Sequence, residues 1–226
     1  MFATPRVPTY PTFEAAEGFG ARTGSMMPGV LENPQQEIGA DEAGRGPLAG
    51  PVVCAAVLLP DGFDISGLND SKKLTPARRE ELYERIVKGA AHRIEFVDPD
   101  EIDRLNILHA SLAGLARAVV GLGGKQAAVD GHIVPKGIPH PCRAVVKGDG
   151  KVAAIAAASI LAKVSRDRFM VQADAEYPGY GFAAHFGYPT PVHLAALKRL
   201  GPCPIHRRSF APVRAMLEQP CLLDLS

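Results

Sequence analysis

The sequence of 226 residues has few cysteines, no long apolar run and almost no net charge. Its cysteines are Cys54, Cys142, Cys203 and Cys221. They form neither a C-x-x-C pair nor a Cys/His ligand spacing, which excludes the usual thiolate zinc site. A domain of this size needs no disulfide framework, so we expect reduced thiols and a cytoplasmic protein.

No segment of the sequence predicts a membrane span. The longest uninterrupted apolar run, Val52 to Leu59, has eight residues, whereas a spanning helix needs about 20. The first residues lack the charged-then-apolar pattern of a secretory signal. Apolar residues make up 46% and charged residues 22% of the chain, which is typical of globular proteins and excludes a disordered or collagenous chain. We expect no membrane association.

The chain divides into one long domain and two short ends. Residues 1–36 hold five prolines, several glycines and no apolar periodicity, so we predict a disordered tail without which the rest folds. The predicted domain covers residues 37–215. Residues 216–226 are predicted to be a short C-terminal tail.

The order of the predicted elements favours an α/β domain, because strands come early and helices lie between and after them. Thr75-Pro76 and Thr190-Pro191 are typical helix starts. The acids at 98–103 are expected to cap a helix and not to bind metal. The predicted strands are 38–41, 52–59, 92–97, 127–130 and 143–146, and the predicted helices are 75–89, 98–103, 106–119, 152–175 and 190–201, with a loop at 177–188.

The near-zero net charge conceals a basic C-terminal stretch. Residues 177–217 contain no Asp or Glu but carry six aromatic residues and five cations, namely Lys198, Arg199, Arg207, Arg208 and Arg214. A segment with charges of one sign and interspersed aromatic rings favours binding to a polyanion such as nucleic acid. An ordinary solvated surface would have the same composition, so this feature alone leaves both interpretations open.

Four acids lie next to the ends of predicted elements. Asp41-Glu42 is followed by a glycine-rich turn, Asp130 ends a strand, and Asp149 comes directly before the long helix. Such positions can converge at one edge of an α/β sheet. Clustered carboxylates repel each other unless cations neutralise them, and Mg²⁺ or Mn²⁺ is the natural partner for oxygen ligands. Ions of this kind can activate water for phosphodiester hydrolysis.

Neighbouring side chains on a regular strand point to opposite faces. We therefore expect Asp41 and Glu42 to serve one site only if their strand distorts or ends there. Asp167 lies inside the long helix between two arginines, where a salt-bridged structural role is expected.

Eight blocks of the sequence, in order, resemble the motifs of the ribonuclease HII family. They are 41–52, 70–74, 105–108, 129–131, 147–149, 157–164, 187–190 and 206–210. Two positions depart from the family pattern: His132 stands where Asn is usual, and Phe186 where a basic residue is common.

The resemblance implies a ribonuclease H-like fold, with a mixed sheet flanked by helices and a helical C-terminal part. It implies a metal-dependent endonuclease acting on RNA–DNA hybrids and on single ribonucleotides embedded in duplex DNA. The cut would leave 3′-hydroxyl and 5′-phosphate ends, as in removal of misincorporated ribonucleotides and RNA primers. We expect a monomer that uses Mg²⁺ or Mn²⁺.

The resemblance also assigns expected roles to single residues. The metal-binding and catalytic acids would be Asp41, Glu42, Asp130 and Asp149. The substrate-binding residues would be Gly44, Arg45 and Gly46 at the ribose 2′-hydroxyl, Tyr188 on the neighbouring sugar, and Lys72, Arg207 and Arg208 at phosphates. A non-catalytic hybrid-binding module of the same fold, or a related nuclease with another substrate, remains the alternative.

Overall fold

The computed structural model describes residues 31–218 except 33, 35, 69–70 and 72–73. At its centre is a five-stranded sheet with the order β3-β2-β1-β4-β5. β1 pairs antiparallel with β2 and parallel with β4, β2 pairs antiparallel with β3, and β4 pairs parallel with β5. The strands are β1 (Glu37–Ala43), β2 (Val52–Leu58), β3 (Ala91–Val97), β4 (Gln126–Asp130) and β5 (Cys142–Val145).

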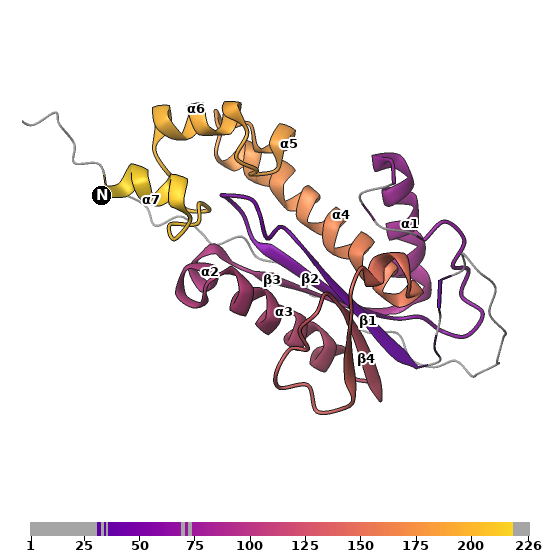
Figure 1. The fold of residues 1–226 in the computed structure, drawn as a ribbon. Helices are drawn as coiled ribbons and strands as arrows, with labels where there is room; N and C mark the ends of the chain where they lie inside the picture. Colours follow the sequence, from indigo (N-terminus) through magenta and orange to yellow (C-terminus); the bar gives the residue numbers. More distant parts are fainter. Residues whose placement is uncertain (1–30, 33, 35, 69–70, 72–73, 219–226) are drawn as a thin grey trace, which may run out of the picture.

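Helices cover both faces of this mixed sheet (Figure 1), as predicted. The long helix α4 (Ala153–Glu176) and α1 (Pro76–Gly89) pack on one face. The other face is covered by α3 (Ile107–Leu122), which follows α2 (Pro99–Leu105). The C-terminal helices α5 (Phe182–His185), α6 (Pro191–Leu200) and α7 (Ala211–Glu218) follow the far end of α4. Their position brings residues 205–207, between α6 and α7, to the loop between β1 and β2.

Several helix starts are the ones that the sequence predicts. The Thr75 hydroxyl accepts from the Arg78 N–H, and the Asp98 carboxylate accepts from the Glu101 N–H over 2.8 Å. Asn106 caps α3. These capping side chains satisfy N–H groups that the first helical turn leaves without a partner.

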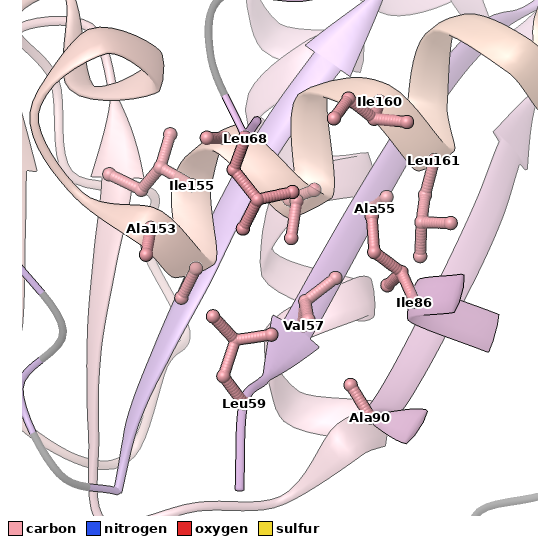
Figure 2. Close-up of a cluster of buried hydrophobic side chains, with 14 of the residues drawn as sticks. Ala55, Val57, Leu59, Leu68, Ile86, Ala90, Ala153, Ile155, Ile160 and Leu161 are labelled. Atoms are coloured by element: carbon pink, nitrogen blue, oxygen red, sulfur yellow. The ribbon is translucent and has the colours of Figure 1, made fainter. Parts of the chain in front are cut away.

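One close contact brings α4 directly onto the sheet. The first half of α4 is rich in alanine and fully buried, and a Cβ at Gly39 of β1 would overlap the backbone of Ala154. Around this contact the α4 side of the core is filled by aliphatic side chains from β2, α1 and α4 (Figure 2). Glycine is therefore needed at position 39 because helix and strand meet without space for a side chain.

The structure differs from the predicted elements at a few places. The segment 177–188, predicted as loop, contains the short helix α5, and α7 continues to Glu218, beyond the boundary drawn at 215. The buried face of α3 includes Ser111 and Leu115, whereas Leu108 and Leu112 are half-buried. None of the described helices alone is long and apolar enough to cross a membrane. Only α2 and α3 taken together have the necessary length and apolarity, and they are bent by 118° relative to each other.

Ordered contacts begin before Glu37. Glu32 bridges to Val152: its N–H donates to the Lys151 carbonyl over 2.7 Å, and its carbonyl accepts from the Ala153 N–H over 2.8 Å. Ala153 is the first residue of α4, so this bridge satisfies an N–H at the start of the helix. Residues 1–30 of the predicted tail lie outside the described residues.

We expect a chain that starts at Glu37 to melt at a lower temperature than one that starts at Leu31. The shorter chain loses both backbone hydrogen bonds of Glu32, and each contributes about 0.5–1.5 kcal/mol. In a chain of this size 1 kcal/mol corresponds to about 2–4 °C. Thermal melts followed by circular dichroism measure the difference; identical midpoints would show that the bridge does not contribute to stability.

Candidate active site

Two of the predicted acids lie side by side on neighbouring parallel strands. β1 and β4 pair with Ala40 opposite Val129. Asp41 and Asp130 are the next residues on each strand, and matched residues of parallel strands point to the same face. That face is the one covered by α4, since Gly39, two residues before Asp41, contacts α4.

Asp41 is buried among other acids. Burial raises the pKa of its carboxyl well above the ordinary value, and the charges of Glu42 and Asp130 raise that pKa further. Two hydrogen bonds favour the charged form: the Ser159 hydroxyl of α4 donates to the carboxylate, and the Glu42 N–H donates to Oδ1 over 2.7 Å. The Ser159 hydroxyl oxygen lies 3.0 Å from the Ser71 hydroxyl oxygen. Hydrogen bonds therefore connect Ser71, Ser159 and the Asp41 carboxylate.

Asp149 is brought to the same edge by the loop before α4. It lies in η2 (Gly148–Gly150), a short 3-10 turn. The Gly148 N–H donates to Asp130 Oδ1 over 2.7 Å, and a Cβ at Gly148 would crowd Ile155 of α4. Gly148 is thus held between α4 and Asp130, and this contact brings the backbone of the next residue, Asp149, near Asp130.

Glu42 approaches from the other face of the sheet. β1 continues regularly through Ala43, with Glu42 opposite Cys54. The strand therefore neither ends nor distorts at Asp41 and Glu42, which was the condition for both side chains to lie on one face. β4 ends at Asp130, next to Asp41, and Glu42 lies beyond that end. Glu42 and Asp130 therefore line one open cleft of about 70 Å³, together with side chains of α3.

The acids fit a hard divalent cation by the chemistry of their oxygens. The pKa of Asp41 is raised mainly by burial and further by repulsion from Glu42 and Asp130, and a bound cation would relieve that repulsion. In the described part of the chain, no three His, Cys, Asp or Glu side chains gather closely enough to enclose an ion. Asp41, Glu42 and Asp130 thus form an acidic edge rather than a closed coordination sphere, and the loop that carries Asp149 contacts this edge through Gly148.

The glycine-rich turn after Glu42 is held by two buried arginines. Arg166 of α4 donates to the carbonyls of Ala49 (3.1 Å) and Pro51 (3.0 Å). Its side chain also occupies the space that a Cβ at Gly44 would need, and Gly44 adopts a φ of +95°. Burial lowers the pKa of Arg166 to about 10, so the guanidinium still carries its charge at neutral pH.

Arg207 has a different environment from the one predicted. Its side chain is 0% exposed, and it donates to the carbonyls of Gly50 (2.9 Å), Arg45 (3.1 Å) and Gly44 (2.6 Å). Burial and the charge of Arg166 lower its pKa to about 9. The prediction that Arg207 contacts a phosphate is therefore wrong, because its N–H groups donate to carbonyls of the turn and are not accessible to solvent.

The other expected substrate contacts are at the surface or outside the described residues. Tyr188 is 43% exposed, and a Cβ at Gly46 would lie 3.5 Å from its ring, so the ring stands next to the turn. Arg208 is exposed, while its backbone N–H donates to the Asp103 carboxylate over 2.8 Å. Lys72 lies outside the described residues.

The sequence analysis did not identify Arg166 as a residue that supports the turn. It correctly predicted a salt-bridged structural role for Asp167. Asp167 pairs with Lys163 at 2.8 Å, as an ion pair within α4. Arg166 is a cation in a buried, alanine-rich helix, two turns after Ser159. A charged residue at helical spacing on an apolar face is the signal that could have identified it.

Comparison with known proteins gives a consistent result. The sequence profile of the family described as Ribonuclease HII matches residues 38–213. The ribonuclease HII of Maricaulis maris is 55% identical over 196 residues, which cover 86% of this chain and 90% of that protein. The ribonuclease H2 of Pyrococcus horikoshii superposes with a TM-score of 0.68 at 29% identity, covering 80% of this chain and 97% of that one. Bst-RNase HIII, solved in complex with Mn²⁺, shares the fold with a TM-score of 0.61 at 18% identity, covering 81% and 69% of the two chains.

The electrostatics of Asp41 give a test of the acidic edge. We expect Asp41→Asn to raise the melting temperature in EDTA, by about 2–4 °C for each kcal/mol of relieved repulsion and burial cost. Because the folded state raises the pKa of Asp41, the gain is absent at low pH, where the carboxyl is protonated in both states. It grows as the pH rises above the ordinary pKa of Asp, about 3.9.

Mg²⁺ should stabilise the unaltered protein more than Asp41→Asn, since a cation binds the native carboxylates. Glu81→Gln, which removes an exposed carboxylate that pairs with Arg78 on α1, is the matched control and should leave the Mg²⁺ effect unchanged. An Asp41→Asn protein less stable than the parent in EDTA at neutral pH would contradict this account of the acidic edge.

Proposed function

The chain belongs to the ribonuclease HII family, and from that premise we propose which substrates this ribonuclease H cleaves. It incises the RNA strand of RNA–DNA hybrids and duplex DNA at single embedded ribonucleotides. The products carry 3′-hydroxyl and 5′-phosphate ends. Its role is the removal of misincorporated ribonucleotides and RNA primers from DNA.

One observation carries the proposal: the acidic edge lies directly beside the rigid turn 44–46 and Tyr188. The acids alone could act on any phosphodiester, because they hold no group that distinguishes ribose from deoxyribose. The distinguishing group is the 2′-hydroxyl, which both donates and accepts hydrogen bonds. A glycine-containing backbone turn next to the acids would let main-chain groups approach that hydroxyl closely.

Asp41, Glu42, Asp130 and Asp149 are the residues proposed to hold Mg²⁺ or Mn²⁺. When bound, such ions lower the pKa of a water and stabilise the charge on the leaving oxygen. The buried, mutually repelling carboxylates support this assignment. So does the Mn²⁺ complex of Bst-RNase HIII, a protein of the same fold. Ser159 keeps the Asp41 oxygens oriented toward the edge through its hydrogen bond.

Substrate selection is proposed to reside in Gly44, Arg45, Gly46 and Tyr188. The turn 44–46 would meet the 2′-hydroxyl through its backbone, and the half-exposed ring of Tyr188 would pack on the adjoining sugar. The exposed Arg208 is the cation of the 206–208 segment that remains accessible to a phosphate. Lys72 stays proposed as a second phosphate contact.

The first test is incision of a DNA duplex that contains one ribonucleotide, with Mg²⁺ and with EDTA. We expect Mg²⁺-dependent cleavage at that nucleotide and none of the all-deoxy duplex. Asp130→Asn should cost at least ~100-fold in kcat, the scale of losing a charged group at the reacting centre. The Glu81→Gln variant should cut normally.

Two results would contradict the proposal. Equal cutting of the ribonucleotide-containing and all-deoxy duplexes would refute ribose selection. Near-normal turnover by a folded Asp130→Asn protein would refute the assignment of that acid. Binding of the duplex without any cleavage would support the non-catalytic hybrid-binding alternative instead.

The second test concerns Tyr188. We expect Tyr188→Ala to lower kcat at a single ribonucleotide by about 10- to 100-fold, since a small misplacement of the reacting group can cost about 100-fold. Tyr188→Phe keeps the ring and should lose less. The stabilisation of either variant by Mg²⁺ should equal that of the parent. Full activity of Tyr188→Ala would leave the turn as the only part that selects ribose.

A further inference from the structure

Two consecutive buried residues connect the parts proposed to select ribose. His206 and Arg207 are 2% and 0% exposed. Their segment lies against the glycine-rich loop: Ala49 bridges to His206, and the Arg207 N–H donates to the Leu48 carbonyl over 2.8 Å. Since neither side chain reaches the surface, any effect of theirs on the reaction passes through their neighbours.

Arg207 determines the direction of the turn's peptide groups. Its planar guanidinium donates to the carbonyls of Gly44 and Arg45 at the start of the loop and to that of Gly50 at its end. A trans peptide unit points its C=O and N–H to opposite sides of one plane. Because the carbonyls of Gly44 and Arg45 point at Arg207, the N–H groups of Arg45 and Gly46 point away from it. A lysine has one nitrogen and cannot hold three separate carbonyls in one plane.

His206 holds Tyr188 through a second histidine. The Cys203 N–H lies 3.0 Å from His206 Nδ1, and the Cys203 sulfur lies 3.1 Å from the same atom. Nδ1 is therefore the acceptor, and the neutral His206 ring carries its proton on Nε2. That Nε2 lies 3.1 Å from His193 Nε2, and His193 Nδ1 lies 2.9 Å from the Tyr188 carbonyl. These contacts allow one consistent assignment of the ring protons. His206 Nε2–H donates to His193 Nε2, and His193 Nδ1–H donates to the Tyr188 carbonyl.

The order of donation requires both rings to be neutral. Burial lowers the pKa of His193, and burial together with the charge of His193 lowers the pKa of His206 to about 4. At neutral pH neither ring carries a second proton. The network therefore persists under the conditions of an activity assay.

We propose that His206 and Arg207 are positioning residues that fix the turn 44–46 and Tyr188 relative to each other, and so determine the rate of incision at a ribonucleotide. The inference rests on the proposed function, because it gives these two residues a part in the same ribose selection. Arg207 holds the turn 44–46, and the adjacent His206 holds Tyr188 through His193. A displacement of either group would misplace the sugar without changing the acidic edge.

His206 offers a matched pair of variants. In His206→Gln the side-chain amide can still donate from the position of Nε2, whereas in His206→Asn the shorter amide keeps only the acceptor near Nδ1. We expect His206→Asn to lower kcat at a single embedded ribonucleotide by about 10- to 100-fold, the scale of misplacing a reacting group. His206→Gln should stay within about threefold of the parent. In both variants KM and stabilisation by Mg²⁺ should stay as in the parent.

A double-mutant cycle separates positioning from a general loss of structure. If His206 acts through Tyr188, then His206→Asn should cost less than about twofold in a protein that already carries Tyr188→Ala, because coupled residues are not additive. A merely structural defect would reduce kcat by the same factor in both backgrounds. Arg207→Lys, which keeps the charge but not the fork, should lower kcat while the effect of Mg²⁺ on melting persists.

The outcomes distinguish this inference from the function on which it rests. If the unaltered protein does not incise the ribonucleotide-containing duplex, the proposed function is wrong and the inference with it. If the unaltered protein incises this duplex, and His206→Asn and Arg207→Lys incise it with the same kcat as the unaltered protein, only the inference is overturned. Equal losses from His206→Asn in the parent and in the Tyr188→Ala variant would overturn it as well.

Discussion

The direct contact of α4 with β1 is the constraint on which the rest of the site depends. At Gly39 the helix backbone lies where a side chain would otherwise be, and alanines on the helix allow the approach. With the helix at that distance, Ser159 reaches Asp41. Two turns later, Arg166 reaches the loop carbonyls of Ala49 and Pro51. One helix therefore supports both the acidic edge and the turn beside it.

The turn is rigid because buried carbonyls and buried guanidinium groups satisfy each other. A buried carbonyl without a donor costs free energy, and a buried cation without acceptors costs more. Arg166 and Arg207 donate to carbonyls between Gly44 and Pro51. Moving the loop would leave polar groups on both sides without partners. The loop is consequently held in place without a side chain of its own, and its glycines stay available for close approach to a ligand.

The C-terminal segment joins the two faces of the molecule at the site. His206 and Arg207 pack under the loop, and the next residues are held by Asp103 of α2, which accepts from the N–H groups of Arg208 and Ser209. The stretch that reads as uniformly basic in the sequence thus has two kinds of cation. Arg207 is internal and organises the turn, whereas Arg208 is exposed and accessible to a phosphate.

Features that depend on residues close together in the chain could be predicted from the sequence. Thr75, Asp98 and Asn106 cap helices as predicted, and acids at strand ends indicated Asp41 and Asp130, because capping and strand periodicity act over a few positions. Tertiary structure alone decided which of two adjacent arginines is buried. It also decided that Glu42 and Asp130 line one cleft and that His193 and His206 are joined by a hydrogen bond. These depend on groups far apart in the chain whose hydrogen bonds form only when α4, the loop after β1 and the C-terminal segment pack together.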